Sequence, residues 1–209
     1  MLCAVACATR PESTRTPPGA EPSSVPALAA AIEADSRRSD HETDSKTKAE
    51  LAADADRDAH ACLARDAQAA ACIYGQAVAL GLEARAHPTR AGELLNAMLE
   101  SLTRAESADP GYDEAGPARV RALVLIRAPG WPLGPGDTDA GLIAARRAAA
   151  LRPTYPPNLL ALAEALAKSG DANGARESYG KARDAAQSLT GGEDRDDWLR
   201  QADEGLHRK

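Results

Sequence analysis

The side chains with the clearest chemical potential are the cysteines and histidines, four of each in 209 residues. Cys62 and Cys72 lie ten positions apart, and neither belongs to a Cys-x-x-Cys pair. If one helix carries both, about 15 Å of helix axis separates them, which is too far for a disulfide. We therefore expect two small buried hydrophobic side chains. His60 faces another side of the same helix and has no set of further ligands nearby, so no metal site is predicted.

The remaining nucleophiles and bases do not form the sequence motifs of common enzyme classes. The chain has no Gly-x-Ser-x-Gly, no His-Glu-x-x-His, no Gly-Lys phosphate loop and no glycine-rich dinucleotide motif. Its histidines are scattered along the chain, at His41, His60, His87 and His207. We predict a protein that is not an enzyme and uses no cofactor.

Trp131 is the most conspicuous aromatic residue, because it lies among the prolines and glycines of residues 129–136. An exposed aromatic side chain on such a loop is a candidate contact for a ligand or a peptide. The alternative is a tryptophan that folds back over a helix pair and fills a gap between small side chains. We favour the buried position, because a buried indole contributes much apolar area to an alanine-rich core.

Arg119, Arg127 and Tyr155 are the other candidate ligand- or partner-binding residues. Arg119 either enters a cleft and binds a carboxylate, or forms an ion pair within the chain, which is the favoured interpretation. The acidic candidates for that pair are Asp113, Glu114 and Asp139. Tyr155 and Asn158 flank two prolines at a helix start, where turn and capping roles are expected.

The composition indicates an all-α fold. Only 3% of the residues are aromatic, phenylalanine is absent, and alanine is the commonest residue. Valine, isoleucine and threonine, which strands favour, are sparse. Alanine is the best helix former and lets helices approach closely. We therefore predict a packed all-α protein, with the helical region over 48–209.

Prolines, glycines and polar turns divide this region into helices. A long helix, open to interruption, is expected over 48–80, and a central buried helix over 117–128, where apolar residues occupy most faces. Further helices are predicted over 90–107, 138–151, 157–168, 172–188 and 193–206.

The first eight residues are small and apolar, and the chain turns polar directly after them. Val5-Ala6-Cys7 looks like the end of a bacterial lipoprotein signal, and this resemblance implies that Cys7 carries the lipid. The open alternative is an apolar N-terminus without a targeting role. Residues 9–47 are expected to be a disordered polar linker with at most a short helix over 27–34, and no apolar run is long enough to span a membrane.

Gly136-Asp137 and Gly170-Asp171 lie 34 positions apart, which is the period of the tetratricopeptide repeat (TPR). The last part of the chain resembles that family position by position. The matching residues are Leu159, Leu162, Ala163, Gly170, Ala175, Tyr179 and Ala182, and those of the preceding unit are Gly136, Ala148 and Pro153. The resemblance implies stacked helix pairs, that is, an antiparallel helix-pair α-solenoid over 48–209 that ends in a capping helix at 193–206. The units are expected at about 66–110, 115–153 and 157–188.

A shorter stretch, Gly116-Pro117-x-Arg119-Val120, together with the loop and helix pairs that follow, resembles the T component of TRAP transporters. That family consists of periplasmic helical lipoproteins with repeat-like helix pairs around a ligand pore. The resemblance implies a small-molecule ligand in a cavity near Trp131 and the arginine-bearing helix.

The expected function is non-enzymatic protein binding, in which the concave face of stacked helix pairs holds a peptide or helix of another protein. A lipid-anchored periplasmic location is favoured over the cytoplasm. The alternative is a ligand-binding accessory component of a TRAP-type transporter. Nucleic acid is not an expected partner, because the net charge is −6 and the arginines alternate with acidic residues.

Overall fold

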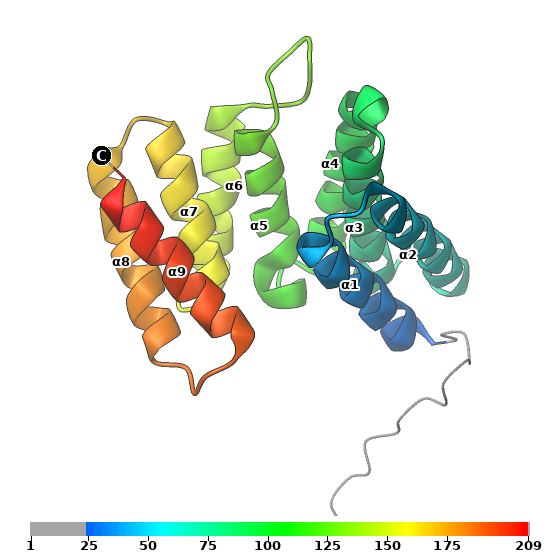
Figure 1. The fold of residues 1–209 in the computed structure, drawn as a ribbon, viewed down its shortest axis with the longest axis horizontal. Helices are drawn as coiled ribbons and strands as arrows, with labels where there is room; N and C mark the ends of the chain where they lie inside the picture. The colour runs from blue at the N-terminus through cyan, green and yellow to red at the C-terminus, as the bar shows by residue number, and fades with distance from the viewer. Residues whose placement is uncertain (1–23, 209) are drawn as a thin grey trace, which may run out of the picture.

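The computed structural model describes residues 24–208. Over this range the chain forms nine α-helices, one short 3-10 helix and no β-strand (Figure 1). The prediction of an all-α fold of stacked helices is confirmed. The elements are α1 (Val25–His41), α2 (Ser45–Arg65), α3 (Ala70–Ala86), η1 (Pro88–Arg90), α4 (Ala91–Ala108), α5 (Tyr112–Arg127), α6 (Thr138–Leu151), α7 (Pro156–Lys168), α8 (Ala172–Gln187) and α9 (Glu193–His207).

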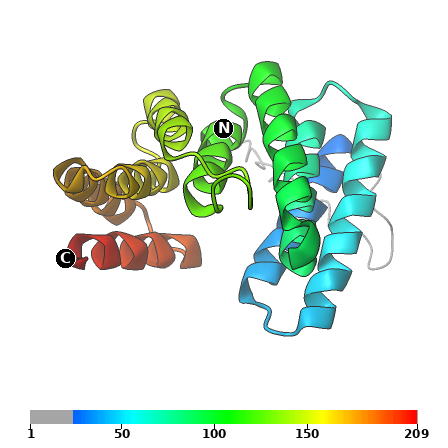
Figure 2. The same cartoon turned by 90° about the horizontal axis from the view of Figure 1, so that it is seen from above.

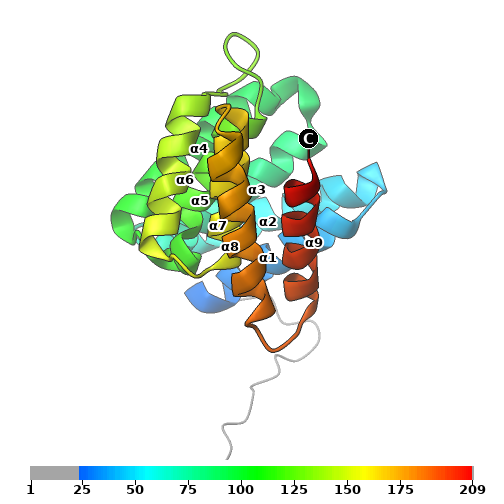
Figure 3. The same cartoon turned by 90° about the vertical axis from the view of Figure 1, so that its left-hand side faces the viewer.

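Each helix packs mainly against its neighbours in the chain. The hairpins α3–α4, α5–α6 and α7–α8 are closely packed; α3–α4 lies inside the expected unit 66–110, while α5 and α7 begin three residues and one residue before the expected units 115–153 and 157–188. Helices α1 and α2 form a further pair against α3, and α9 packs against α8 at the other end (Figure 3). Figure 2 shows two blocks, α1–α4 and α5–α9, which meet mainly where α4 packs against α5.

Small side chains allow the helices to approach one another closely. Tyr179 and the alanines at the expected repeat positions are buried, and Ala182 is fully buried between α8 and its neighbours. A Cβ atom at Gly205 of α9 would overlap the Tyr179 ring, so glycine is needed where α9 crosses α8. The other buried repeat positions are Leu159, Ala163, Ala175 and Ala148, while Leu162 is half-buried and Pro153 is exposed.

The two Gly-Asp pairs at the 34-residue spacing occupy equivalent places. Asp137 caps α6 by accepting from the Ala140 N–H at 3.0 Å, and Asp171 caps α8 by accepting from the Gly174 N–H at 2.8 Å. Each aspartate is preceded by a glycine, and the backbone requires glycine at the two positions for different reasons. Gly170 has a φ of 90°, which favours glycine, whereas a Cβ at Gly136 would overlap the backbone of residues 128–129.

Cys62 and Cys72 form a disulfide, so the expectation of two unbridged side chains is wrong. The expected helix over 48–80 reverses direction between Arg65 and Ala70, and the two Cα atoms lie 5.2 Å apart on different helices. Asp66 stabilises this reversal, because its Oδ1 accepts from the backbone N–H of the two residues before Ala70, at 2.9 and 3.0 Å. No proline or glycine marks the turn, which is why helix periodicity alone did not locate it.

The expected linker over 9–47 is wrong for the part that the structure describes. Helix α1 begins at Val25, and Leu28 and Ile32 are almost completely buried against α2 and α3. Most residues of α1 are small or polar, so the few large apolar residues that it buries do not stand out in the sequence. The remainder of the expected linker and Cys7, the predicted lipidation site, lie outside the described residues.

Candidate functional site

The turn that begins α5 has an unusual backbone. Asp113, Glu114 and Ala115 have φ angles of 47°, 53° and 66°, so three successive non-glycine residues are left-handed. This conformation costs about 1–2 kcal/mol per residue, and surrounding contacts must hold it in place. Regular α-helical backbone follows the turn, which agrees with the predicted helix start at Pro117.

Asp113 joins the two blocks of helices. Its Oδ2 accepts from the Tyr74 hydroxyl of α3 at 3.0 Å and from Arg119 Nη2 of α5 at 2.8 Å. A Cβ at Gly116 would lie 2.5 Å from the same oxygen, so the arrangement requires glycine there. Burial, with a contribution from the Asp113 charge, raises the pKa of Tyr74 far above its usual range. Arg119 therefore forms the ion pair that the sequence favoured.

Asn158 of α7 is fully buried and connects this helix to the same turn. Its Nδ2 donates to the Glu114 carbonyl at 2.9 Å and to the Ala148 carbonyl at 3.2 Å, while its Oδ1 accepts from Arg119 Nη1 at 3.1 Å. The expected capping role for Asn158 is wrong. Because α5 covers this face of α7, the amide is buried and forms hydrogen bonds to neighbouring elements instead of capping its own helix.

Tyr155, the N-cap residue of α7, lies between Arg119 and Trp198. The guanidinium carbon of Arg119 is 5.3 Å from the centroid of the Tyr155 ring. Tyr155 in turn meets Trp198 of α9 edge to face, with ring centroids 5.7 Å apart. Each such contact contributes about 0.5–1.5 kcal/mol beyond simple burial. Burial also raises the pKa of Tyr155 above its ordinary value.

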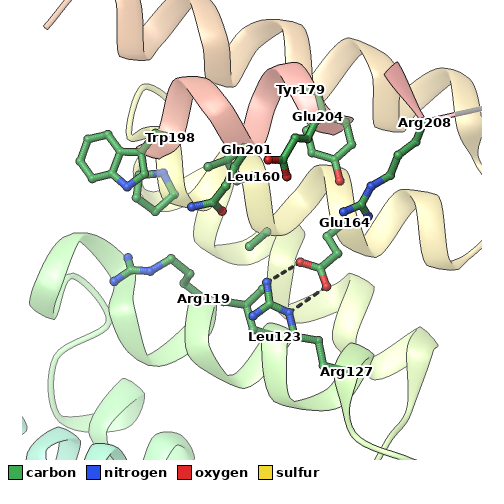
Figure 4. A pocket seen from close by; sticks show the side chains of 12 residues that line it. Arg119, Leu123, Arg127, Leu160, Glu164, Tyr179, Trp198, Gln201, Glu204 and Arg208 are labelled. Carbon is green, nitrogen blue, oxygen red and sulfur yellow. Dashed lines mark hydrogen bonds and ion pairs between the residues drawn. The ribbon is translucent and has the colours of Figure 1, made fainter. Parts of the chain in front are cut away.

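A pocket of about 290 Å³ opens beside these aromatic rings, between α5, α7, α8 and α9 (Figure 4). Arg127 crosses it and donates to both carboxylate oxygens of Glu164, from Nε at 2.8 Å and from Nη2 at 2.6 Å. These bonds raise the pKa of Arg127. Arg208 points toward Glu164 in Figure 4. The lining also includes Arg119, Leu123, Pro157, Leu160, Ala161, Tyr179, Trp198, Gln201 and Glu204.

A second, more apolar hollow of about 570 Å³ lies between the two blocks; we call it the groove. Its walls come from α3 and α4 on one side and from α5 on the other, and Ser36 of α1 reaches its edge. Its apolar lining consists of Val78, Leu95, Met98, Val120, Leu123, Val124 and Ala128. Tyr74, Gly81, Arg85 and Arg127 complete it. The groove is open, so part of its apolar surface faces solvent.

Trp131 is 90% exposed, so the favoured expectation of a buried indole is wrong. Leu133, two positions later, is 77% exposed. Hydrogen bonds within the loop of residues 129–136 fix its conformation, including one from the Gly136 N–H to the Pro129 carbonyl at 2.9 Å. These bonds close the loop on itself, so the indole projects into solvent instead of packing against the helices.

The structure brings three of the four predicted binding residues together. Arg119 and Arg127 line the same pocket, and Tyr155 contacts Arg119, while Trp131 stands apart on its loop. Tyr74 was missed in the sequence because its partner lies 39 positions away. Trp198 was also missed, because nothing in the sequence indicated its contact with Tyr155.

Within residues 24–208, no group of three or more His, Cys, Asp or Glu side chains is placed to hold a metal ion. No helix in that range combines the length and apolar character needed to cross a bilayer. Comparison with known proteins adds no assignment: no protein-family model and no curated protein matches the chain.

Proposed function

We propose that the chain is a non-enzymatic, TPR-like scaffold whose groove binds an apolar segment of a protein. The observation that carries this proposal is the groove itself, an open apolar hollow between two stacks of helices. Exposed apolar surface that is continuous in this way marks interaction sites in soluble proteins. An amphipathic helix or an extended segment with one aromatic anchor fits such a shape.

Helix hairpins at the expected repeat units support a scaffold role. Repeats that stack through small residues present their larger side chains on one face, which partners then contact. Here Val120, Leu123 and Val124 of α5 are half-buried: each packs against the edge of a core cluster and also lines the groove. The buried polar network around Asp113 holds the wall they belong to at a fixed position relative to α3.

A peptide selection with purified protein tests the proposal. Peptides selected on the wild-type chain should carry aromatic or aliphatic anchors at helical spacing, and Val124→Glu should weaken their binding at least about tenfold. Ile143→Glu is the matched control, because Ile143 is an aliphatic residue of α6 that is 66% exposed and does not line the groove. Equal binding by both variants would show that the groove is not the binding site.

We also propose an envelope location, anchored through Cys7 as the lipoprotein-like sequence implies. The Cys62–Cys72 disulfide supports this proposal, because disulfides persist in oxidising compartments such as the periplasm. Acid-quenched cells, alkylated under denaturing conditions, should release two additional reactive thiols only after reduction. A double Cys62→Ser, Cys72→Ser variant should lack that increase. Reaction of Cys62 and Cys72 themselves before reduction in the native host, identified by mass spectrometry of the alkylated peptides, would contradict the location.

The pocket beside Trp198 favours one alternative function, capture of a small carboxylic acid by a TRAP-type accessory component. Its volume of about 290 Å³ is at the lower end for ligand sites, and it contains arginines and an aromatic wall. Thermal unfolding in the presence of a panel of small carboxylic acids tests it. Stabilisation of the wild-type chain that Arg127→Gln removes would support ligand capture over protein binding.

A further inference from the structure

The loop of residues 129–136, which we call the hook, presents apolar side chains on an ordered support. The N–H groups of Leu133 and Gly134 donate to the Gly130 carbonyl at 3.1 and 3.3 Å, and this turn fixes the hook tip. Trp131 and Leu133 nevertheless remain 90% and 77% exposed. An ordered loop that holds a tryptophan in water has the properties of a binding anchor, because a rigid aromatic side chain loses little entropy on binding.

The hook stands directly beside the groove. Ala128, the residue before the hook, lines the groove, and so does Arg127. On the other wall, a Cβ at Gly92 of α4 would lie 3.4 Å from the Leu133 carbonyl oxygen. Figure 1 shows the loop rising from α5 and α6 at the end of the gap that separates them from α4. One edge of the molecule therefore carries both an apolar projection and an apolar hollow.

We infer that two copies of this chain exchange hooks, so that Trp131 and Leu133 of each copy occupy the groove of the other. The inference rests on the proposed role of the groove as a protein-binding site. A projection and a hollow on the same edge suit a two-fold pair, in which each copy uses the same surface. The apolar groove lining matches the indole, and the half-exposed guanidinium of Arg85, which is paired with Asp40, can lie over its face.

The area that such an exchange buries favours the reciprocal pair. One tryptophan buries about 150–250 Å², and the groove covers a similar area around it. Two hooks in two grooves therefore bury about 600–1,000 Å² from Trp131 alone, and Leu133 and Pro132 bring the total to the roughly 1,200 Å² of the smallest stable interfaces. A single hook in a single groove buries half as much, so a one-sided contact is weaker than the reciprocal pair.

The first test measures the mass of the full chain in solution. Sedimentation velocity and light scattering over a wide concentration range should show a reversible dimer. Trp131→Ser should raise the dissociation constant at least about a hundredfold, because it removes two anchors that are each worth at least about tenfold. Ile143→Ser removes another exposed apolar side chain, 66% exposed and outside the hook and groove, and should leave the dimer unchanged.

A mixing experiment separates exchange between copies from other roles of the hook. Val124→Glu should also give a monomer, because it places a charge in the groove. Trp131→Ser mixed with Val124→Glu should form heterodimers, because the first variant keeps an intact groove and the second keeps an intact hook. The affinity of the heterodimer should lie between that of the wild-type dimer and that of either variant alone. In a Trp198→Phe background, Trp131 is the only tryptophan, and its fluorescence should shift to the blue as concentration rises.

Four results would overturn the inference. A wild-type chain that stays monomeric, or a dimer that survives Trp131→Ser, excludes hook exchange. Neither result decides whether the groove binds peptides, which the peptide selection tests separately. A higher ring that Trp131→Ser dissolves excludes the two-fold geometry. A monomer that binds phosphatidylglycerol vesicles through Trp131 assigns the hook to membranes instead.

Discussion

Replacing Asn158 with alanine is expected to destabilise the protein more than any change on its surface. The side chain is fully buried and holds three partners: the Glu114 carbonyl, the Ala148 carbonyl and the guanidinium of Arg119. A hydrogen bond to a charged group contributes about 1.5–3 kcal/mol, and a neutral one contributes about 1 kcal/mol. The free energy of unfolding should therefore fall by about 3–5 kcal/mol, a large part of the stability of an average domain.

Urea denaturation followed by circular dichroism measures this loss, provided that the m-value is unchanged. Asn96→Ala is the matched control. Asn96 is exposed, and its Nδ2 donates only to the Gly92 carbonyl within α4, at 2.9 Å. The control should change stability by less than about 0.5 kcal/mol. A loss below about 1 kcal/mol for Asn158→Ala would refute the conclusion that this amide holds α7 to the left-handed turn.

Three further predictions concern the same interior. Gly116→Ala should lower the unfolding free energy by about 1–3 kcal/mol, because its Cβ would lie 2.5 Å from the Asp113 carboxylate oxygen; urea melts measure this loss, and an unchanged midpoint would contradict it. Ala182→Phe should cost about 1–3 kcal/mol by overpacking a site with no exposed surface; a thermal melt equal to that of wild type would place Ala182 outside the core. The pKa of Tyr74 is raised by burial, so its stabilising contribution is present below its ordinary pKa near 10 and is lost as pH rises above it. Tyr74 should therefore ionise only when the protein unfolds at alkaline pH, and the tyrosinate absorbance gained in that transition should be smaller in Tyr74→Phe than in wild type. Equal absorbance changes in the two proteins would contradict this assignment.

Residue types and their short-range spacing predicted much of the architecture. Alanine content excluded strands, and prolines, glycines and aspartates placed the limits of the helices from α4 to α9 within a few residues. The 34-residue spacing located two equivalent helix caps, Asp137 and Asp171, because capping depends only on residues a few positions away. The burial of Tyr179 and Ala182 followed from their positions in the same pattern.

Errors arose where the deciding partner lies far away in the chain. Helix α1 was not recognised because its burial depends on α2 and α3, and the Cys62–Cys72 disulfide depends on a turn without proline or glycine. Trp131 was expected to be buried because an indole gains much from burial, yet the loop of residues 129–136 closes on itself through its own hydrogen bonds and leaves the indole in solvent.

The sequence by itself determined that this chain forms stacked helices, because helix propensity, capping and small-residue spacing act over a few positions. Only the tertiary structure decided where Asp113, Asn158 and Tyr74 meet and that a groove opens beside an exposed hook. These features depend on how one hairpin is oriented against the next. That orientation is set by side chains about 40 positions apart, such as Tyr74 with Asp113, which no local pattern connects.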